Sequence, residues 1–170
     1  TYSEKDLCRI ISTYGEEKHA KSIARNIVKE RNLKPITTTF ELVDIIKHSM
    51  PYKDTINKHP AKKTFQAIRI EVNHELDILE SSLRKSLSML NVGGRVLVIT
   101  FHSLEDRIVK NLFKELTSVD KVVNNLPVIP EEYLPNFKLI TEKVIVPSDL
   151  ELQENNRSHS SKLRIIERIK

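Results

Sequence analysis

A short polar sequence, Phe101-His102-Ser103, follows a run of β-branched and apolar residues from Arg95 to Thr100. Such a run is typical of a strand that is buried on both faces in a parallel sheet. In open α/β sheets, ligands bind just beyond the carboxyl ends of the strands. The sequence therefore predicts that Phe101, His102 and Ser103 lie at a binding site.

Each of the polar side chains also has a structural interpretation. Ser103 begins a Ser-Leu-Glu-Asp sequence, which predicts a capping box with Asp106, so Ser103 can cap a helix and also contact a substrate. His102 can be a hydrogen-bonded core residue, or it can stack on or hydrogen-bond to a base. Metal binding by His102 is the weakest option because no second ligand stands at a suitable spacing. Arg107 is expected to face a carboxylate or a phosphate, and the sequence does not distinguish the two.

The second half of the chain is predicted to be an α/β arrangement. A helix over about 104–116 follows the first strand, and two further strands are predicted at 138–146 and 162–170, with a polar, mobile segment expected at 149–160 between them. Three strands with one intervening helix form only part of a doubly wound domain. We therefore expect the rest of that domain to precede Thr1.

The first half of the chain is predicted to be helical. Capping boxes at Ser3 and at Thr38–Glu41 begin two helices, and apolar residues at helical spacing predict another helix over 16–31. A long helix is then predicted from about 64 to 90, and the sequence 91–94 ends it. This pattern predicts a helical module at residues 1–66, followed by the α/β part at 67–170.

Two groups of basic residues belong to this helical half. The first group follows one face of the second helix and consists of Lys18, Lys21, Arg25 and Lys29. The second group surrounds the start of the long helix and consists of Lys58, Lys62, Lys63 and Arg69. Such groups bind nucleic acid phosphates in some proteins and are solvated surface in others. Both interpretations remain open for the first group on the spacing alone.

The composition restricts the class of protein. A net charge of +5 favours an anionic partner. Only three glycines are present, which excludes a glycine-rich nucleotide loop, and the single cysteine, Cys8, excludes an internal disulfide or a multi-cysteine metal site. No apolar run approaches the roughly 20 residues that a membrane span requires. We expect a globular cytoplasmic protein without a metal ion.

Four stretches of the sequence closely resemble one protein family. They are YGEEKHAKSIARNIV (14–28), HPAKKTFQAIRIEVNHEL (59–76), GGRVLVITFHSLEDRIVK (93–110) and SSKLRIIERI (160–169). In this order they are similar to the bacterial 16S rRNA cytosine-N4 methyltransferases, the RsmH (MraW) family. The resemblance covers essentially the whole chain, and four motifs in one order make chance similarity implausible.

The resemblance implies the activity, the cofactor and the fold. Family members transfer a methyl group from S-adenosylmethionine to the exocyclic amine of a cytosine in the decoding region of 16S rRNA, within the small ribosomal subunit. They have a Rossmann-like methyltransferase domain interrupted by a helical substrate-recognition insert. By this resemblance, residues 1–66 belong to that insert and residues 67–170 form the C-terminal part of the methyltransferase domain.

The resemblance also limits which residues can be assigned. The family's cofactor loop and its ribose-binding acid precede the matched region, so no cofactor-binding residue is assigned and the chain alone is expected to be inactive. His102, Ser103 and Asp106 are the catalytic candidates, as one wall of the pocket. Phe101, Arg107 and the two basic groups are the substrate-binding candidates.

Two other hypotheses fit the same sequence. One is a non-catalytic basic helical module that binds RNA, with the α/β part as a scaffold. The other is a protein–protein interaction module whose positive surface has no role. A glycine-rich turn after a strand, with an acid at the end of the next strand, would support the enzyme if it were found upstream of Thr1.

Overall fold

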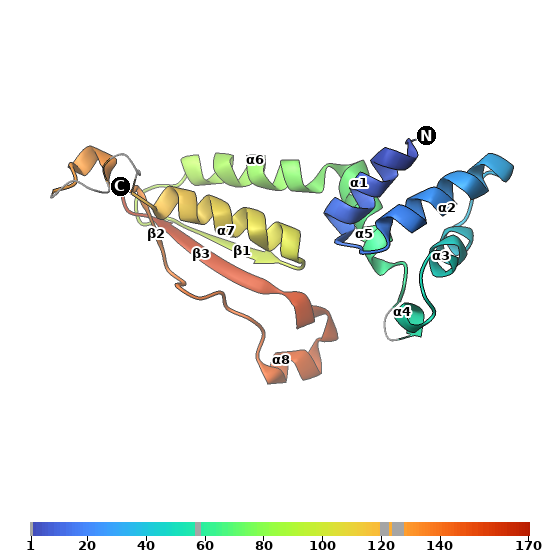
Figure 1. Cartoon of the computed structure of the whole chain (residues 1–170). Helices are drawn as coiled ribbons and strands as arrows, with labels where there is room; N and C mark the ends of the chain where they lie inside the picture. The colour runs from blue at the N-terminus through green and yellow to red at the C-terminus, as the bar shows by residue number, and fades with distance from the viewer. Residues whose placement is uncertain (1, 57–58, 120–122, 124–127) are drawn as a thin grey trace. The chain divides into compact units, whose positions relative to one another are not determined.

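The computed structural model describes residues 2–56, 59–119, 123 and 128–170. The chain divides into two compact units, Thr1–Glu75 and Leu76–Lys170. The first unit is helical, and the second combines helices with a small sheet (Figure 1). Within the described ranges, no helix is both long enough and apolar enough to cross a membrane.

The first unit contains the predicted helices and one additional short helix. In chain order these are α1 (Glu4–Gly15), α2 (Ala20–Leu33), α3 (Thr39–His48), α4 (Lys53–Ile56) and α5 (Lys62–Asn73). A helix begins at each predicted cap. The Ser3 hydroxyl accepts from the Asp6 N–H and donates to the Asp6 carboxylate at 2.6 Å, whereas Thr38 and Glu41 form the full reciprocal capping box.

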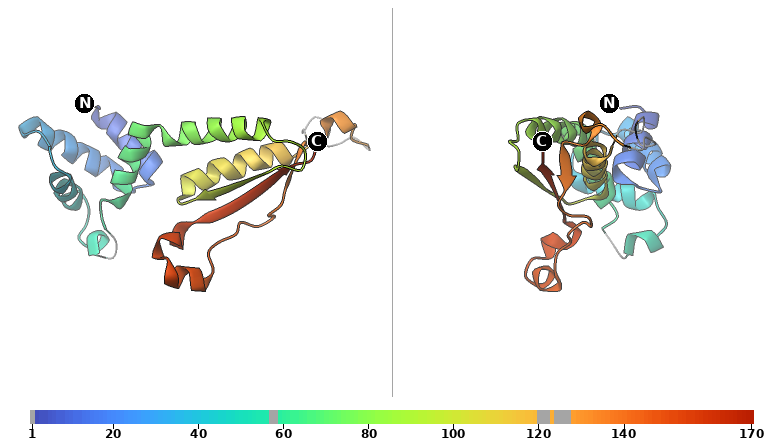
Figure 2. Two further views of the ribbon diagram at one scale, coloured as in Figure 1. Left: turned by 180° about the vertical axis from the view of Figure 1, so that it is seen from behind. Right: turned by 90° about the vertical axis from the view of Figure 1, so that its left-hand side faces the viewer.

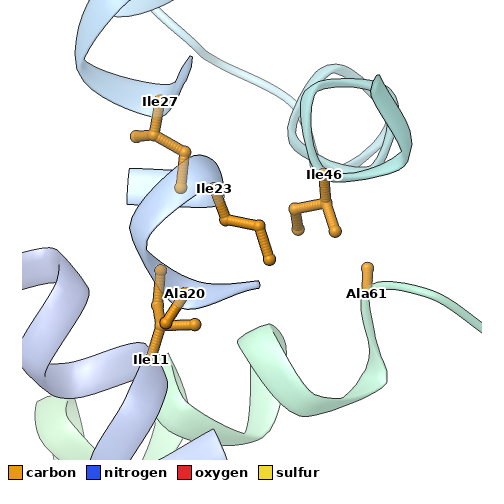
Figure 3. Close-up of a cluster of buried hydrophobic side chains, with 6 residues drawn as sticks. All are labelled: Ile11, Ala20, Ile23, Ile27, Ile46 and Ala61. Atoms are coloured by element: carbon orange, nitrogen blue, oxygen red, sulfur yellow. The ribbon is translucent and has the colours of Figure 1, made fainter. Parts of the chain in front are cut away.

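The core of this unit forms where the apolar faces of the helices meet. Its fully buried members are small or branched aliphatic residues, which Figure 3 shows converging between the helices: Ile11, Ala20, Ile23, Ile27, Ile46 and Ala61. Because every member lies before residue 62, the unit has a hydrophobic core of its own.

α1 and α5 pack closely where α1 ends. A Cβ atom at Gly15 would lie 2.7 Å from the Lys63 carbonyl oxygen, so only glycine permits this approach. Two α5 side chains then donate to carbonyl oxygens at the end of α1: Gln66 Nε2 donates to Tyr14 at 3.1 Å, and Lys63 Nζ donates to Glu16 at 2.8 Å. These bonds satisfy acceptors that a helix end leaves without partners.

The long helix predicted for 64–90 is instead two helices, α5 and α6 (Glu75–Ser88). His74 separates them in the left-handed conformation, with φ of 52°. The Glu75 carboxylate accepts from Arg69 at 2.8 Å and from Asn73 at 3.0 Å, which stabilises the turn. Apolar spacing continues across the break, so the periodicity that predicted one helix does not reveal it.

The second unit contains a three-stranded sheet in the order β1-β3-β2. After α6 its elements are β1 (Arg95–Thr100), α7 (Ser103–Thr117), a 3₁₀ turn (Glu131–Tyr133), β2 (Phe137–Leu139), α8 (Asp149–Glu154), a second 3₁₀ turn (Asn156–Ser160) and β3 (Lys162–Arg168). β3 pairs antiparallel with both neighbours. The described strands thus form an antiparallel sheet, whereas the apolar run of β1 predicted a parallel one.

One other expectation for this unit needs correction. The strand predicted over 138–146 is shorter, because only Phe137–Leu139 pairs regularly and Ile145 adds a single bridge to Leu163. The polar segment 149–160, which was expected to be mobile, contains α8, which begins where the Ser148 hydroxyl accepts from the Glu151 N–H.

Helices cover one face of the sheet. α7 lies along β1 and β3 (Figure 2), and the core joins Leu83 and Leu87 of α6 with Leu112 and Phe113 of α7 and Ile166 of β3. Val96 and Val98 of β1 pack against this core.

The opposite face of β1 is open in the described part of the chain. Leu97 is 59% exposed and Ile99 is 58% exposed. The prediction that this strand is buried on both faces is therefore wrong for the described residues. A continuous apolar run cannot by itself distinguish one covered face from two.

Candidate functional site

The polar sequence after β1 forms the start of α7. His102 is extended, with φ of −146° and ψ of 165°, and its Nδ1 accepts from the Glu105 N–H at 3.4 Å. The Glu105 carboxylate in turn accepts from the N–H groups of Phe101 at 2.8 Å and His102 at 3.3 Å. The capping box therefore joins His102 with Glu105, one residue earlier than the predicted pairing of Ser103 with Asp106, and Ser103 is the first residue of the helix.

The capping geometry determines the tautomer of His102. Because Nδ1 accepts a hydrogen bond, the neutral ring carries its proton on Nε2. That atom is buried and lies 3.3 Å from Glu105 Oε1, close enough for electrostatic attraction but without hydrogen-bond alignment to any described residue. Burial raises the pKa of Glu105, but the adjacent His102 side chain and the hydrogen bond from the Phe101 N–H together outweigh burial, so the pKa lies below its ordinary value.

Asp106 lies on the covered side of the sheet. Its carboxylate accepts from Arg164 Nε at 2.8 Å, from Arg164 Nη2 at 3.2 Å and from Lys162 Nζ at 3.2 Å. The Arg164 guanidinium, with a smaller contribution from Lys162, holds the pKa of Asp106 below its ordinary value despite burial. Asp106 thus fastens α7 to β3.

The sequence interpretation did not identify Lys162 and Arg164 as members of this group. The available signal was their spacing, because residues two apart on a strand share a face. Both therefore face α7 together with Ile166, on the covered side of the sheet.

The other two candidates near β1 are accessible to solvent. Phe101 is 56% exposed, although the N–H groups of Phe101 and His102 both donate to the Glu105 carboxylate and so hold the backbone around it. Arg107 is exposed on α7. Beyond the end of β1, the side chains of Phe101 and Arg107 are therefore exposed to solvent. His102 and Asp106 instead bind other groups within the protein.

The first basic group lies along and just before α2. Lys18 precedes the helix and forms an ion pair with Asp54 at 3.1 Å, while Arg25 is 4.0 Å from Glu4. Lys21 and Lys29 are exposed and form no ion pair with the described residues. Two of the four cations are therefore available to an external anion without breaking an internal pair.

The second basic group is partly engaged within the first unit. Lys63 donates to the Glu16 carbonyl, and Arg69 makes a forked ion pair with Glu75. Lys62 is exposed without an ion pair among the described residues, and Lys58 lies outside those residues.

Asp54 was not predicted from the sequence as a functional or structural residue. It accepts from His19 Nε2 at 2.9 Å and from Lys18, and His19 is the larger cause of the lowered pKa of Asp54. These bonds join the short helix α4 to the start of α2. The sequence did not predict this contact because a single Asp, distant in sequence from its partners, forms no recognisable pattern.

The residues near β1 do not fit a complete S-adenosylmethionine site. Binding ribose hydroxyls requires an available acid, but Glu105 and Asp106, the carboxylates just beyond the end of β1, already bind internal partners. The chain has three glycines and no glycine-rich loop. In the described ranges, no three His, Cys, Asp or Glu side chains are grouped so that they could hold a metal ion.

Comparison with known proteins gives consistent results along the chain. Residues 1–169 match the model of the MraW methylase family. The chain is 54% identical over 169 residues to a Fusobacterium nucleatum protein named ribosomal RNA small subunit methyltransferase H, covering 99% of this chain and 53% of that protein. It is 52% identical over 170 residues to the Lactobacillus acidophilus protein of the same name, covering 99% and 54%, respectively.

The comparisons also show how much of such a protein is present. The chain spans about half the length of the curated relatives it matches. The match nevertheless extends along both compact units. The chain therefore belongs to the MraW methylase family.

Proposed function

We propose that the protein containing this chain methylates the exocyclic N4 amine of a cytosine in the decoding region of 16S rRNA, within the small ribosomal subunit and in the cytoplasm. The observation that carries this proposal is the family match from residue 1 to residue 169, together with relatives named as small subunit rRNA methyltransferases. Residues 1–66 are proposed to recognise the substrate, and residues 67–170 to form the C-terminal part of the methyltransferase domain.

S-adenosylmethionine would supply the activated methyl group, and no residue of this chain is assigned to it. The contribution of this chain is to position the base. A cytosine that undergoes chemistry must leave its stack and enter a pocket. Its amine lone pair is delocalised into the ring, so acceptors that bind the amine N–H groups should help to expose the nitrogen.

The end of β1 is suited to holding such a base. The exposed ring of Phe101 offers a stacking face, and the Glu105 carboxylate fixes the backbone that carries it. We assign His102 and Asp106 to positioning, because His102 caps α7 and Asp106 joins α7 to β3. Ser103 and Arg107 remain candidates for contacts with the base edge and a phosphate.

The basic groups are proposed to contact the RNA backbone. Lys21, Lys29 and Lys62 are exposed and form no ion pair with the described residues. Each phosphate that they neutralise would release counterions, so binding should weaken as the salt concentration rises. These exposed lysines also support the alternative function, a non-catalytic RNA-binding module.

Methylation by the full-length protein tests the role of Phe101. Base–aromatic stacking contributes about 1–3 kcal/mol, so Phe101→Ala should lower methylation of small subunits roughly 5- to 150-fold, whereas Phe101→Tyr should retain most of it. Leu150→Ala, which also truncates an exposed apolar side chain, is the control. Wild-type methylation by Phe101→Ala would remove Phe101 from the pocket. RNA binding without methylation by the full-length protein would favour the non-catalytic module.

A further inference from the structure

Asp106 binds one more cation than its single charge requires. Arg164 alone spans the carboxylate, because its Nε donates to Oδ1 at 2.8 Å and its Nη2 donates to Oδ2 at 3.2 Å. Lys162 Nζ adds a third bond, to Oδ2 at 3.2 Å. A forked arginine already matches a carboxylate in both charge and geometry. Lys162 is therefore a second cation, which the connection between α7 and β3 does not require.

The cluster carries an excess positive charge that solvent can reach. Among the described residues, one carboxylate binds the two cations, and the neighbouring acid, Glu105, already accepts from backbone N–H groups at the start of α7. The Lys162 side chain is 39% exposed, whereas the Arg164 and Asp106 side chains are 17% and 11% exposed. A ligand can therefore approach the ammonium, while the forked ion pair lies beneath it.

The Lys162 ammonium also has unused hydrogen-bond donors. A lysine has three N–H donors, and within the described part of the chain Lys162 Nζ has one hydrogen-bond partner, Asp106. The bond to Asp106 orients the ammonium, so the other two donors are held in place. A fixed cation with two unused donors is suited to an anion that has several oxygen atoms.

Lys162 lies at the same end of β1 as the proposed base pocket. In the antiparallel pairing of β1 with β3, Lys162 is opposite Thr100, the last residue of β1. Phe101, whose exposed ring is proposed to stack on the cytosine, follows Thr100 directly. The excess cation is therefore next to the place where the target nucleotide is proposed to bind.

The anion that fits this position best is a phosphate of the RNA. A nucleotide that leaves its stack rotates about its backbone, so its own phosphates stay at the edge of the pocket. A lysine ammonium binds phosphate as a compact point charge. A contact with the base is less suitable, since a cation at the cytosine O2 or N3 would draw electron density away from the N4 amine that must act as the nucleophile.

We propose that Lys162 binds a phosphate of the target nucleotide at the pocket beyond β1. Asp106 orients the ammonium, and Arg164 keeps Asp106 in place. The proposal rests on the proposed function and adds to it a substrate contact from β3, a strand to which no binding role was assigned.

The opposite end of the sheet provides a matched control. Glu167 also binds two cations, Arg95 at 2.6 Å and Lys138 at 2.9 Å, so Lys138 is likewise a second cation on a paired carboxylate. Arg95 begins β1 and Thr100 ends it, which separates the two clusters by about 17 Å along the strand. Lys138→Ala and Lys162→Ala therefore remove the same charge from similar clusters, and only Lys162 lies at the pocket.

Binding of the full-length protein to small ribosomal subunits, measured over a range of salt concentrations, tests the proposal. Lys162→Ala should weaken binding roughly tenfold through loss of a hydrogen bond to a charged group, and should make the slope of log affinity against log salt concentration less steep by about one. Lys162→Arg keeps the charge and should keep most of the affinity. Lys138→Ala should leave the affinity and the salt slope close to those of the wild type.

Thermal unfolding distinguishes a contact with RNA from a structural role. Arg164 still pairs with Asp106 in Lys162→Ala, so this variant and Lys138→Ala should both unfold close to the wild-type temperature. If Lys162→Ala instead unfolds far below Lys138→Ala, and Lys162→Arg does not restore binding, Lys162 is a structural residue and the proposal is wrong.

Three other outcomes would also overturn the proposal. If Lys162→Ala and Lys138→Ala bind subunits equally well, Lys162 makes no contact with the RNA, and methylation by the wild type would still support the proposed function. If Lys162→Ala weakens only the binding of S-adenosylmethionine, measured by calorimetry, the ammonium binds the cofactor instead. If the wild-type protein binds no small subunits, this proposal and the proposed function both fail.

Discussion

Asp106 shows how a single carboxylate can connect segments that are distant in sequence. It lies on α7 and binds Arg164 and Lys162 of β3, and only 8% of the residue is exposed. The Ser-Leu-Glu-Asp sequence predicted a local role in capping. The long-range role depends on the path of β3 back beside β1, which no local pattern contains.

Asp106→Asn should destabilise the second unit by about 2–3 kcal/mol, because the substitution leaves Arg164 and Lys162 without their counter-charge in a largely buried position. Urea denaturation measures the loss. Glu115→Gln removes the exposed partner of Arg84 and should cost less than about 1 kcal/mol. Equal losses in the two variants would contradict the assigned role of Asp106.

The stability contributed by Asp106 should also depend on pH. Its pKa is lower in the folded state than in the unfolded state, so its contribution is present above the ordinary Asp pKa of about 3.9 and is lost as the pH falls through the folded value. The stability difference between wild type and Asp106→Asn should therefore shrink below about pH 4. A difference that stays constant in acid would contradict this explanation.

The presence of each helix and strand was predicted better than the residues at which it begins and ends. The helix starts predicted at Ser3 and Thr38 were correct because side chains near in sequence satisfy the first free N–H groups, although only Thr38 and Glu41 form the full reciprocal box. The box at α7 was displaced by one residue. Two overlapping pairs, His102 with Glu105 and Ser103 with Asp106, have the same spacing, and only the second, in which serine is the commoner cap, was considered from the sequence. The tertiary bonds of Asp106 engage its carboxylate elsewhere.

His102→Ala should destabilise α7 by about 1 kcal/mol through loss of the cap, whereas His102→Asn should restore the cap. Thermal unfolding of the chain measures both. In the full-length protein, His102→Asn should also retain more methylation than His102→Ala, because a capped α7 keeps Phe101 in place. A stable His102→Asn variant without activity would instead show that the imidazole contacts the base.

Gly15→Ala should destabilise the first unit by about 1–3 kcal/mol, because the new Cβ would collide with the Lys63 backbone and force α1 and α5 apart. Thr13→Ala, at an exposed position of the same helix, is the matched control and should leave stability unchanged or slightly higher. Circular dichroism during urea unfolding compares the two. An unchanged urea midpoint for Gly15→Ala would show that α1 and α5 can move apart without a loss of stability.

On the scale of the whole molecule, the two hydrophobic cores share no residue. The change from helices to a strand near residue 95 could be predicted because the hydrophobic period changes there. The strand directions could not be predicted. β3 pairs with β1 across more than 60 residues, and the apolar run of β1 does not specify its neighbour.

Because the cores are separate, Ile46→Ala should act only on the first unit. The substitution opens a cavity among fully buried residues and should cost about 2–5 kcal/mol. Hydrogen exchange should then show lost amide protection in α1, α2 and α3 with unchanged protection in β1 and β3. Equal loss in both units would show that they unfold as one.

The outward face of the sheet has one further consequence, which concerns folding errors. Glu167 of β3 binds Arg95 of β1 at 2.6 Å and Lys138 of β2 at 2.9 Å, so one carboxylate holds three strands in line. A slip of one residue would turn Glu167 toward the apolar core and separate it from both cations. The ion triplet therefore favours the native strand register over a register shifted by one residue.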